Sequence, residues 1–273
     1  MQPLRDRFPA PAVMGVVNVT PDSFSDGGVF LDAGAAVAHG LQLVADGADV
    51  LDVGGESTRP GADPVPLEVE LERVLPVIDG LVQQTDVPIS IDTVKAAVAE
   101  QAIRAGAGFV NDVSALRHDP AMAEVVAEAG VPVCLMHMLG EPKTMQRDPR
   151  YADVVEDVAA FLTERVSFAR SSGISPDLIC VDPGIGFGKT AEHNWTLLRH
   201  LDRIAAVGPP LVVGASRKSF LGRLTGEPEE GREFATVAVN LDAVRRGAWM
   251  LRVHAVKPTR QALAVASAIE TAP

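Results

Sequence analysis

A repeated alternation of short apolar runs and longer segments with helical spacing constrains the fold of this chain more than any other feature. Eight such units follow one another, with no Pro/Ser-rich linker and no low-complexity tract between them. Strands that alternate with helices pair in parallel through right-handed crossovers, and eight units within about 250 residues fit a closed (β/α)₈ barrel, the TIM barrel. The sequence therefore predicts one α/β barrel domain over residues 1–273, with 1–12 as an N-terminal tail. A doubly wound open sheet is the alternative.

The bounds of the units follow from hydrophobic periodicity. The expected strands are 13–19, 49–53, 89–92, 109–112, 131–137, 178–181, 210–214 and 249–253. The expected helices are 33–46, 67–83, 94–105, 120–129, 151–171, 192–207, 231–247 and 258–270. Thr93 is expected to cap the helix that follows it.

Polar side chains recur where the expected strands end. They occur on six of the eight strands, at Asn18, Asp92, Asn111, Asp182, Lys218 and the pair Arg252 and His254. One polar strand end is usually a helix cap or a core hydrogen bond, but that interpretation is poor for the whole set. Because the C-terminal rim of the strands carries the active site in (β/α)₈ barrels, we expect these residues to form one.

The stretch 178–190, LICVDPGIGFGKT, places an acid and a glycine-rich turn directly after a buried strand. Glycine has no Cβ, so the backbone of such a turn can approach a flat or charged ligand closely. The stretch is not a P-loop, because Pro183 stands where the first glycine of that motif belongs. It is not the dinucleotide fingerprint either, because Lys189 replaces the third glycine. We therefore reject ATP and NAD as ligands of this turn.

Composition limits the partners and the compartment. The 36 acidic residues outnumber the 24 basic ones, and a net charge of −12 argues against a general nucleic-acid binder, which presents a basic face. No run is long and apolar enough for a membrane span, and the N-terminus lacks the apolar region of a secretory signal. Cys134 and Cys180 lie in apolar runs, so we expect buried thiols in a reducing compartment. These features predict a cytoplasmic protein that acts on small molecules.

Three of the strand-end side chains are hydrogen-bond acceptors: Asp92, Asn111 and Asp182. Buried acceptors suit the donor-rich edge of a nitrogen heterocycle, whose ring N–H and exocyclic amine can pair with one carboxylate. A pair of carboxylates can instead be a general acid and base, or part of a metal site. No Glu/His cluster at metal spacing joins them.

A second group is cationic and consists of Arg59, Lys218, Arg252 and, with less weight, His254. Together these side chains suit a phosphate or diphosphate leaving group. A Schiff-base lysine is an alternative for Lys189 and Lys218. Both lysines lie in expected loops rather than in barrel strands, which disfavours that role.

Segments along nearly the whole chain carry a family pattern. They are MGVVNVTPDSFSDGG at 14–28, DVGGESTRPGA at 52–62, SIDT at 90–93, NDVSA at 111–115, MHM at 136–138, DPGIGFGKT at 182–190, GASRKSFLG at 214–222 and RVH at 252–254. With these segments the chain resembles the dihydropteroate synthases, pterin-binding barrel enzymes of folate biosynthesis. The resemblance implies condensation of 6-hydroxymethyl-7,8-dihydropterin diphosphate with 4-aminobenzoate, which gives 7,8-dihydropteroate and diphosphate, with Mg²⁺.

The resemblance also implies a role for each motif residue. The pterin would be held by Asp92, Asn111, Met136, Asp182, Phe187, Gly214 and Lys218. The diphosphate would be bound by Asn18, Arg252 and His254, and Mg²⁺ by Asn18 and Asp26. The aminobenzoate would be framed by Phe24, Thr58, Arg59, Pro60 and Ser219. The catalytic residues would be Asp92, Asp182 and Lys218.

Because an aryl amine is a weak nucleophile, we expect the diphosphate to depart before the amine attacks. The anionic Asp92 would then stabilise a methylene cation conjugated with the pterin. The segment 54–66 is rich in Gly and Pro and longer than a usual βα connection, so we expect it to close over the substrates. Arg59 on this segment has the planar fork that suits the carboxylate of aminobenzoate.

Two other functions remain open. A non-catalytic pterin-binding paralogue would keep the pocket without the reaction. A barrel methyltransferase that binds methyltetrahydrofolate would need neither the STRP nor the SRKSF segment, and this chain has both.

The resemblance further implies a homodimer that pairs through helices of the later units, and an enzyme of the class that sulfonamides inhibit. The sequence adds a weak hint of assembly, because the expected helix 231–247 has apolar residues on more than one face. These residues are Phe234, Val237, Val239, Leu241 and Val244. Packing against a neighbouring helix explains them equally well.

Overall fold

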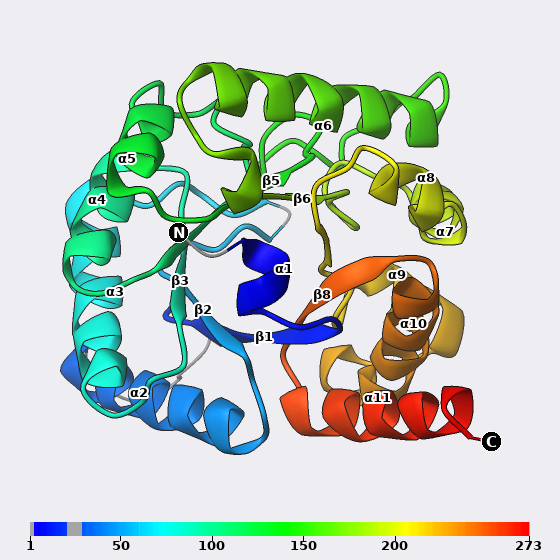
Figure 1. The fold of residues 1–273 in the computed structure, drawn as a ribbon, viewed down its shortest axis with the longest axis horizontal. Coiled ribbons are helices and arrows are strands. Elements are labelled where there is room, and N and C mark those ends of the chain that lie inside the picture. The colour runs from blue at the N-terminus through cyan, green and yellow to red at the C-terminus, as the bar shows by residue number, and fades with distance from the viewer. Residues whose placement is uncertain (1–2, 21–28, 60, 273) are drawn as a thin grey trace.

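A computed structural model describes residues 3–20, 29–59 and 61–272 of the chain. Within them, eight parallel strands pair in chain order and β1 also pairs with β8, so that the sheet closes into a barrel (Figure 1). The strands are β1 (Ala12–Asn18), β2 (Val50–Gly54), β3 (Ile89–Asp92), β4 (Phe109–Asp112), β5 (Val133–Met136), β6 (Ile179–Asp182), β7 (Leu211–Val213) and β8 (Ala248–Val253). The predicted (β/α)₈ barrel is confirmed, and the closing pair of strands excludes the open sheet.

Helices form an outer ring around these strands (Figure 1). They are α2 (Val29–Ala45), α3 (Leu67–Val82), α4 (Ala96–Arg104), α5 (Met122–Ala129), α6 (Val154–Ser171), α7 (Ala191–Arg199), α8 (Leu201–Ala205), α9 (Ser219–Thr225), α10 (Glu233–Arg245) and α11 (Val256–Glu270). The short helix α1 (Leu4–Arg7) lies apart from this ring. Within the described residues, short 3₁₀ turns at Pro176–Leu178 and Glu229–Gly231 lie in the connecting loops.

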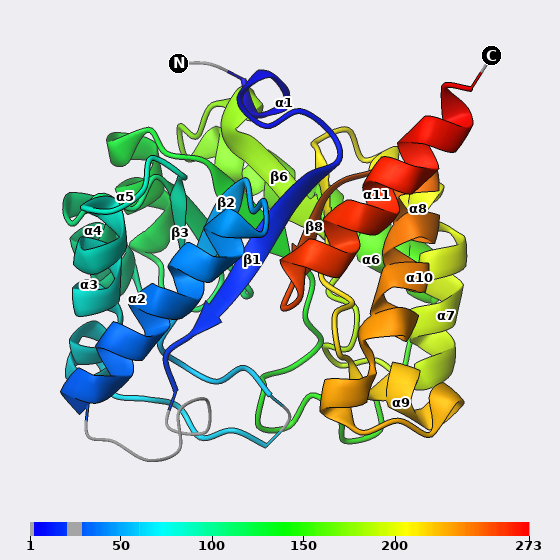
Figure 2. The same ribbon diagram turned by 90° about the horizontal axis from the view of Figure 1, so that it is seen from below.

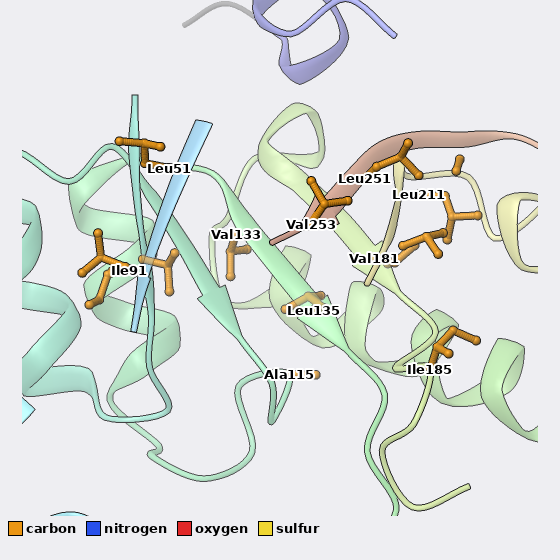
Figure 3. Close-up of a cluster of buried hydrophobic side chains, with 14 of the residues drawn as sticks. Leu51, Ile91, Ala115, Val133, Leu135, Val181, Ile185, Leu211, Leu251 and Val253 are labelled. Carbon is orange, nitrogen blue, oxygen red and sulfur yellow. The ribbon is translucent and has the colours of Figure 1, made fainter. Parts of the chain in front are cut away.

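Side chains on the strands alternate between two apolar layers, as the period of two along a strand requires. The outward layer packs against the helices, and Figure 3 shows part of it, including Leu51, Ile91, Val133, Leu135, Val181 and Leu251. The inward layer near the start of the strands is a separate apolar cluster that includes Met14, Val50, Phe109, Cys134, Cys180, Val212 and Met250. Towards the C-terminal ends, the inward positions become polar.

The N-terminal segment closes one end of the barrel. Helix α1 lies over the barrel axis in Figure 1 and, in Figure 2, at the end opposite the long loops. Leu4 and Phe8 are 1% and 3% exposed, and Trp249 Nε1 donates a 2.8 Å hydrogen bond to the carbonyl oxygen of Phe8. The expected tail 1–12 is therefore corrected, because apolar burial draws its residues onto the barrel and Ala12 already belongs to β1.

Three local predictions were wrong in detail. Thr93 does not cap a helix: its hydroxyl donates to Glu70 Oε1 and accepts from the Lys95 amide, so α4 begins only at Ala96. The expected helix 192–207 is broken at His200, whose ψ of 30° separates α7 from α8. The expected loop 215–230 contains α9, a helix too short for its spacing to stand out in the sequence.

Cys134 and Cys180 are buried, free and paired in register on β5 and β6, as the sequence predicted for buried thiols. In the part of the chain that the structure describes, no helix combines the length and the apolar character that crossing a bilayer requires.

Candidate active site

A cavity of about 370 Å³ lies at the C-terminal ends of the strands. Many of the residues expected to bind substrate line it: Asn18, Thr58, Arg59, Asp92, Phe187, Gly214, Lys218, Ser219, Arg252 and His254. They come from segments far apart in the sequence, and they meet because a closed parallel sheet has all its C-terminal strand ends at one rim. The structure thus brings the expected acceptors and cations to one place.

Three further expected residues are buried just behind the cavity wall. Asp182 is 5% exposed, and its Oδ2 lies 3.6 Å from where a Cβ of Gly214 would be. Met136 belongs to the same apolar cluster as Phe187, and Asn111 donates to Asp52, the carboxylate that also accepts from Arg252 of the cavity wall. The remaining expected residues, Phe24, Asp26 and Pro60, lie outside the described residues.

Arg252 is held by two carboxylates on neighbouring strands. Its Nε donates to Asp52 Oδ2 at 2.6 Å, and its Nη2 donates to Asp92 Oδ2 at 2.7 Å. Asn111 Nδ2 donates to the same oxygen of Asp52 at 2.9 Å. Asp52 is fully buried, and the sequence analysis did not identify it as a site residue. The presence of an acid within the apolar strand VLDVG could have indicated it. The ion pairs orient the guanidinium across the floor of the cavity.

These charges are coupled. Burial opposes the charged form of Arg252, but the carboxylates of Asp52 and Asp92 raise its pKa, so the guanidinium stays protonated. Burial raises the pKa of Asp92 to about 7, even though Arg252 acts in the opposite direction. The Oδ1 atom of Asp52 has no hydrogen-bond partner within the described residues. The floor of the cavity is therefore rich in acceptors.

Two backbone N–H groups of the glycine-rich turn after β6 are engaged by neighbouring side chains. Gly184 N donates to Asp182 Oδ1 at 2.6 Å, and Gly186 N donates to Asn194 Oδ1 at 2.7 Å. Gly184 has φ of 66°, and a Cβ there would collide with the carbonyl oxygen of His137. With these N–H groups engaged, the turn is no phosphate cradle, which agrees with the rejection of a nucleotide motif.

Lys218 precedes α9 and lies over the aromatic face of Phe187. Its Nζ is 4.0 Å from the ring centroid, a cation–π contact that places the ammonium at the cavity wall. Burial lowers the pKa of Lys218 to about 8, and burial raises the pKa of Asp182 to about 6. At neutral pH, Lys218 is therefore an ammonium and Asp182 is a carboxylate.

His254 differs from the cation suggested by the sequence. Its Nδ1 lies 3.0 Å from Ser216 Oγ, and its backbone N–H donates to the same oxygen at 3.2 Å. Burial, followed by the charges of Arg252 and Arg217, lowers the pKa of His254 to about 3. The imidazole is therefore neutral at physiological pH and can offer one N–H to an anion.

The mouth of the cavity is bridged by an ion pair. Arg59 Nη2 donates to Glu229 Oε1 at 2.7 Å, and both side chains line the cavity. The Arg59 side chain is 62% exposed, so the contact is partly screened by solvent. Lys143 Nζ also pairs with Asp63 at 2.6 Å, so the loops after β2 and β5 are joined as well.

The only support for a magnesium site is the chemistry of the side chains that could bind the metal. Among the described residues there is no cluster of three or more His, Cys, Asp or Glu side chains that could hold a metal. Asn18 offers an amide oxygen at the cavity wall. Mg²⁺ binds hard oxygen ligands and commonly takes few protein ligands when substrate phosphates complete its shell, so Asn18 fits such a site.

Comparisons with known proteins agree with the geometry. A family model described as "Pterin binding enzyme" matches residues 14–254. A dihydropteroate synthase of Mycobacterium leprae is 49% identical over 94% of this chain and 92% of its own length. A solved structure of Xanthomonas albilineans dihydropteroate synthase with 4-aminobenzoic acid superposes with a TM-score of 0.91 at 52% identity, over 96% of this chain and 94% of that one. A structure of the enzyme from the same organism with 7,8-dihydropteroate gives 0.87 and 48%, over 96% and 95%.

Proposed function

The chain belongs to the dihydropteroate synthase family, and from that membership we propose the reaction that its cavity performs. It is a transferase that condenses 6-hydroxymethyl-7,8-dihydropterin diphosphate with 4-aminobenzoate to give 7,8-dihydropteroate and diphosphate. One observation carries the proposal: a single cavity joins a floor of buried carboxylates to a mouth lined with cationic and N–H donors.

The pterin is assigned to the inner part of the cavity. Asp182 keeps Oδ2 for a ligand, because its Oδ1 already accepts the Gly184 amide. A carboxylate oxygen there can accept from the ring N–H or the exocyclic amine of the pterin. Phe187 and Lys218 supply a flat wall on one side, and Met136 packs behind Phe187. Gly214 leaves room for the ring, since a side chain at that position would lie against Asp182 and Arg252.

The diphosphate is assigned to Asn18, Arg252 and His254, which line the cavity together. Arg252 contributes a permanent charge, and neutral His254 contributes an N–H donor. Bound diphosphate would compete with Asp52 and Asp92 for Arg252, and it would raise the pKa of His254 by adding negative charge nearby. Mg²⁺ at Asn18 and Asp26 would neutralise charge on the leaving group.

The reaction is assigned a dissociative order. The bond between the methylene carbon and the diphosphate oxygen breaks first, and its electron pair leaves with diphosphate. In its ionised form, which the charge of Arg252 favours, Asp92 stabilises the cation left on the pterin methylene, because the two charges are opposite and the site is buried. The aryl amine then forms the carbon–nitrogen bond and loses a proton. Arg59, Thr58 and Ser219 line the part of the cavity where the aminobenzoate would enter.

A single-turnover experiment tests this order. With dihydropterin diphosphate alone, rapid quench should recover free diphosphate together with a pterin cation or its water adduct. If bond breaking is seen only when aminobenzoate is present, displacement is direct and the assigned order is wrong.

The assembly and the location complete the proposal. Four exposed apolar side chains lie on helices that share one side of the barrel in Figure 2: Leu224 on α9, Phe234 on α10, and Val265 and Ile269 on α11. Phe234 is 91% exposed. Exposed apolar side chains on these helices support a homodimer that pairs through them. A cytoplasmic location and inhibition by sulfonamides belong to the same proposal.

Diphosphate release is the decisive assay. We expect the protein to release diphosphate and form 7,8-dihydropteroate when both substrates are present. A non-catalytic paralogue would bind dihydropterin diphosphate but release no diphosphate with or without 4-aminobenzoate. A methyltransferase would consume methyltetrahydrofolate instead, and would leave both of these substrates unchanged.

A further inference from the structure

Lys189 is a buried lysine that the proposed reaction does not use. It is 3% exposed and follows the glycine-rich turn after β6. It is not among the residues that line the described cavity. Because burying an ammonium is costly unless it is fully hydrogen-bonded, its contacts need a reason.

The ammonium of Lys189 joins the turn to the end of β5. Its Nζ donates to the carbonyl oxygens of Gly184 at 2.9 Å and Phe187 at 3.0 Å, and it lies 2.8 Å from His137 Nδ1. An ammonium has three N–H donors, so these three acceptors satisfy it completely. With its three N–H groups donated to these acceptors, the Lys189 nitrogen has no lone pair directed into the cavity. This argues against Lys189 as a Schiff-base nucleophile.

His137 acts as an acceptor in this arrangement. Burial, with the nearby charges of Lys189 and Arg117, lowers the pKa of His137 to about 2. The ring is therefore neutral, and Nδ1 must be the unprotonated nitrogen that accepts from Lys189. Tyr151 also holds this turn, because its hydroxyl donates to the carbonyl oxygen of Gly188 at 2.8 Å.

The residues that Lys189 holds belong to the pterin pocket. The carbonyl of Gly184 accepts from Lys189 while its N–H donates to Asp182 Oδ1, so one peptide segment links the ammonium to the carboxylate. Phe187, whose carbonyl also accepts from Lys189, carries the ring beneath Lys218. Displacing the ammonium would move both the carboxylate and the aromatic wall.

Charge gives Lys189 a second effect on the same carboxylate. The cations facing Asp182 are Lys218 after β7, Arg252 on β8 and Lys189 after β6. They oppose the burial that raises the pKa of Asp182 to about 6. The groups facing Lys189 are Asp182, Lys218 and neutral His137, and burial lowers the pKa of Lys189 to about 7. Because this value lies above the pKa of about 6 for Asp182, Lys189 is mainly an ammonium at the pH where Asp182 titrates.

We propose that Lys189 is a positioning residue of the pterin site, which holds the glycine-rich turn in place and keeps Asp182 ionised without touching the substrate. This inference rests on the proposed function in one respect, namely that Asp182 binds the pterin as a carboxylate. It adds to that function a role for Lys189, which acts on the pterin through Asp182 and not by direct contact.

The test separates charge from shape with two variants, Lys189→Met and Lys189→Arg. The affinity for dihydropterin diphosphate is measured by calorimetry from pH 5 to pH 8, with circular dichroism and thermal melting as checks of folding. In the unaltered protein, affinity falls as the pH drops through the pKa of Asp182, because the protonated group loses an acceptor. Removing a nearby cation raises that pKa, so the fall begins at higher pH.

Lys189→Met should bind at least about tenfold more weakly at pH 7, and the midpoint of its acid limb should move up by on the order of one pH unit. Lys189→Arg keeps the charge but not the fit, so its affinity should be lower while its midpoint stays in place. Arg104→Met, at an exposed cation on α4 away from the cavity, serves as the control and should change neither quantity.

A uniform loss of affinity at every pH in Lys189→Met, with no movement of the midpoint, would overturn the proposal and leave a purely structural role. If Lys189→Met does not fold, Lys189→Gln carries the same comparison, because it lacks the charge and keeps an N–H donor. Failure of the proposed function is a different result, since the unaltered protein would then bind no dihydropterin diphosphate.

Discussion

Asp182 illustrates how one side chain is prepared for a ligand. The Gly184 amide fixes Oδ1, the ring of Phe187 and the ammonium of Lys218 lie at the cavity wall, and Gly214 leaves Oδ2 unobstructed. The carboxylate is thus oriented before any substrate arrives. Preorganised acceptors of this kind lose little freedom on binding, which favours affinity.

The first prediction at this scale is that Asp182→Asn abolishes turnover by weakening pterin binding. The amide presents a donor where the pterin also presents one, and an unpaired buried polar contact costs roughly 1–3 kcal/mol, or about ten- to a hundredfold or more in affinity. Calorimetry with dihydropterin diphosphate measures the loss. Asp177→Asn, at an exposed acid before the same strand, is the control. Unchanged affinity in Asp182→Asn would remove the carboxylate from the pterin site.

Arg59 is the second residue whose surroundings suggest a measurable effect. Its partner Glu229 occupies the guanidinium that the aminobenzoate carboxylate would need. An exposed ion pair is worth only about 0–1 kcal/mol, so the substrate can displace Glu229 at a small cost. Because Glu229 and aminobenzoate compete for Arg59, substitution of Arg59 should raise the aminobenzoate KM and substitution of Glu229 should lower it.

We predict that Arg59→Ala raises the aminobenzoate KM by on the order of tenfold and leaves pterin binding nearly intact, because closure of the loop adds to the small free energy of an exposed ion pair. Arg59→Lys should recover only part of the loss, because a point charge lacks the planar fork. Glu229→Gln should lower the same KM about two- to threefold by freeing the guanidinium. Glu230→Gln, one residue further along and exposed, is the control. Weaker pterin binding in Arg59→Ala with an unchanged aminobenzoate KM would assign this loop to the other substrate.

At the scale of elements, α1 and the residues after it close the end of the barrel that is opposite the candidate active site. Phe8 packs edge-on against Trp249, with ring centroids 6.1 Å apart, and Trp249 bonds to the Phe8 backbone. This contact is made at the start of the strands, whereas the substrate groups lie at their ends. Stability and chemistry are therefore separated along the barrel axis, as is usual for this fold.

This separation predicts that Phe8→Ala destabilises the protein and leaves catalysis almost unchanged. Removing a buried phenylalanine side chain typically costs about 3–5 kcal/mol, because the cavity left behind relaxes only partly. Denaturant titration gives the free energy of unfolding, and kcat/KM is measured at a temperature where the variant is still folded. Arg5→Ala, at an exposed position of α1, should leave the free energy of unfolding within about 0.5 kcal/mol. A large fall in kcat/KM with stability retained would contradict the separation.

At the scale of the whole molecule, exposed apolar side chains are concentrated on α9, α10 and α11. Phe234 on α10 is 91% exposed, so packing within the barrel does not explain this part of the helix. Val239 and Leu241 on the same helix do pack against the core. The apolar character of α10 on more than one face therefore has two different causes.

We predict a homodimer at micromolar concentration, measured by light scattering, which Phe234→Glu converts to a monomer. A charge placed in an apolar interface must be desolvated, so association should weaken strongly. Val82→Glu is the control, since α3 lies on the other side of the barrel in Figure 1 and Val82 is 44% exposed. A monomeric mass for the unaltered protein would contradict the proposed assembly.

The sequence by itself determined the barrel and the composition of its rim. Apolar periodicity is a local property, so strands and helices could be read within a few residues of their observed ends. Closure of a parallel sheet then forces the strand ends to one rim, which is why Asn18, Asp92 and Arg252 were expected to meet. The family motifs supplied the roles that geometry alone left open.

Only the tertiary structure decided which of these groups are paired. Arg252 meets Asp52 across 200 positions of the chain, and Arg59 meets Glu229 across 170. Neither pairing leaves a local signal, because both depend on where distant segments are brought by folding. Burial in the folded protein likewise makes His254 neutral. It also accounts for the Lys189 ammonium, which donates to the carbonyl oxygen of Gly184 in the preceding glycine-rich turn. The cost of an unpaired buried charge depends on its complete surroundings, and those exist only once the barrel has closed.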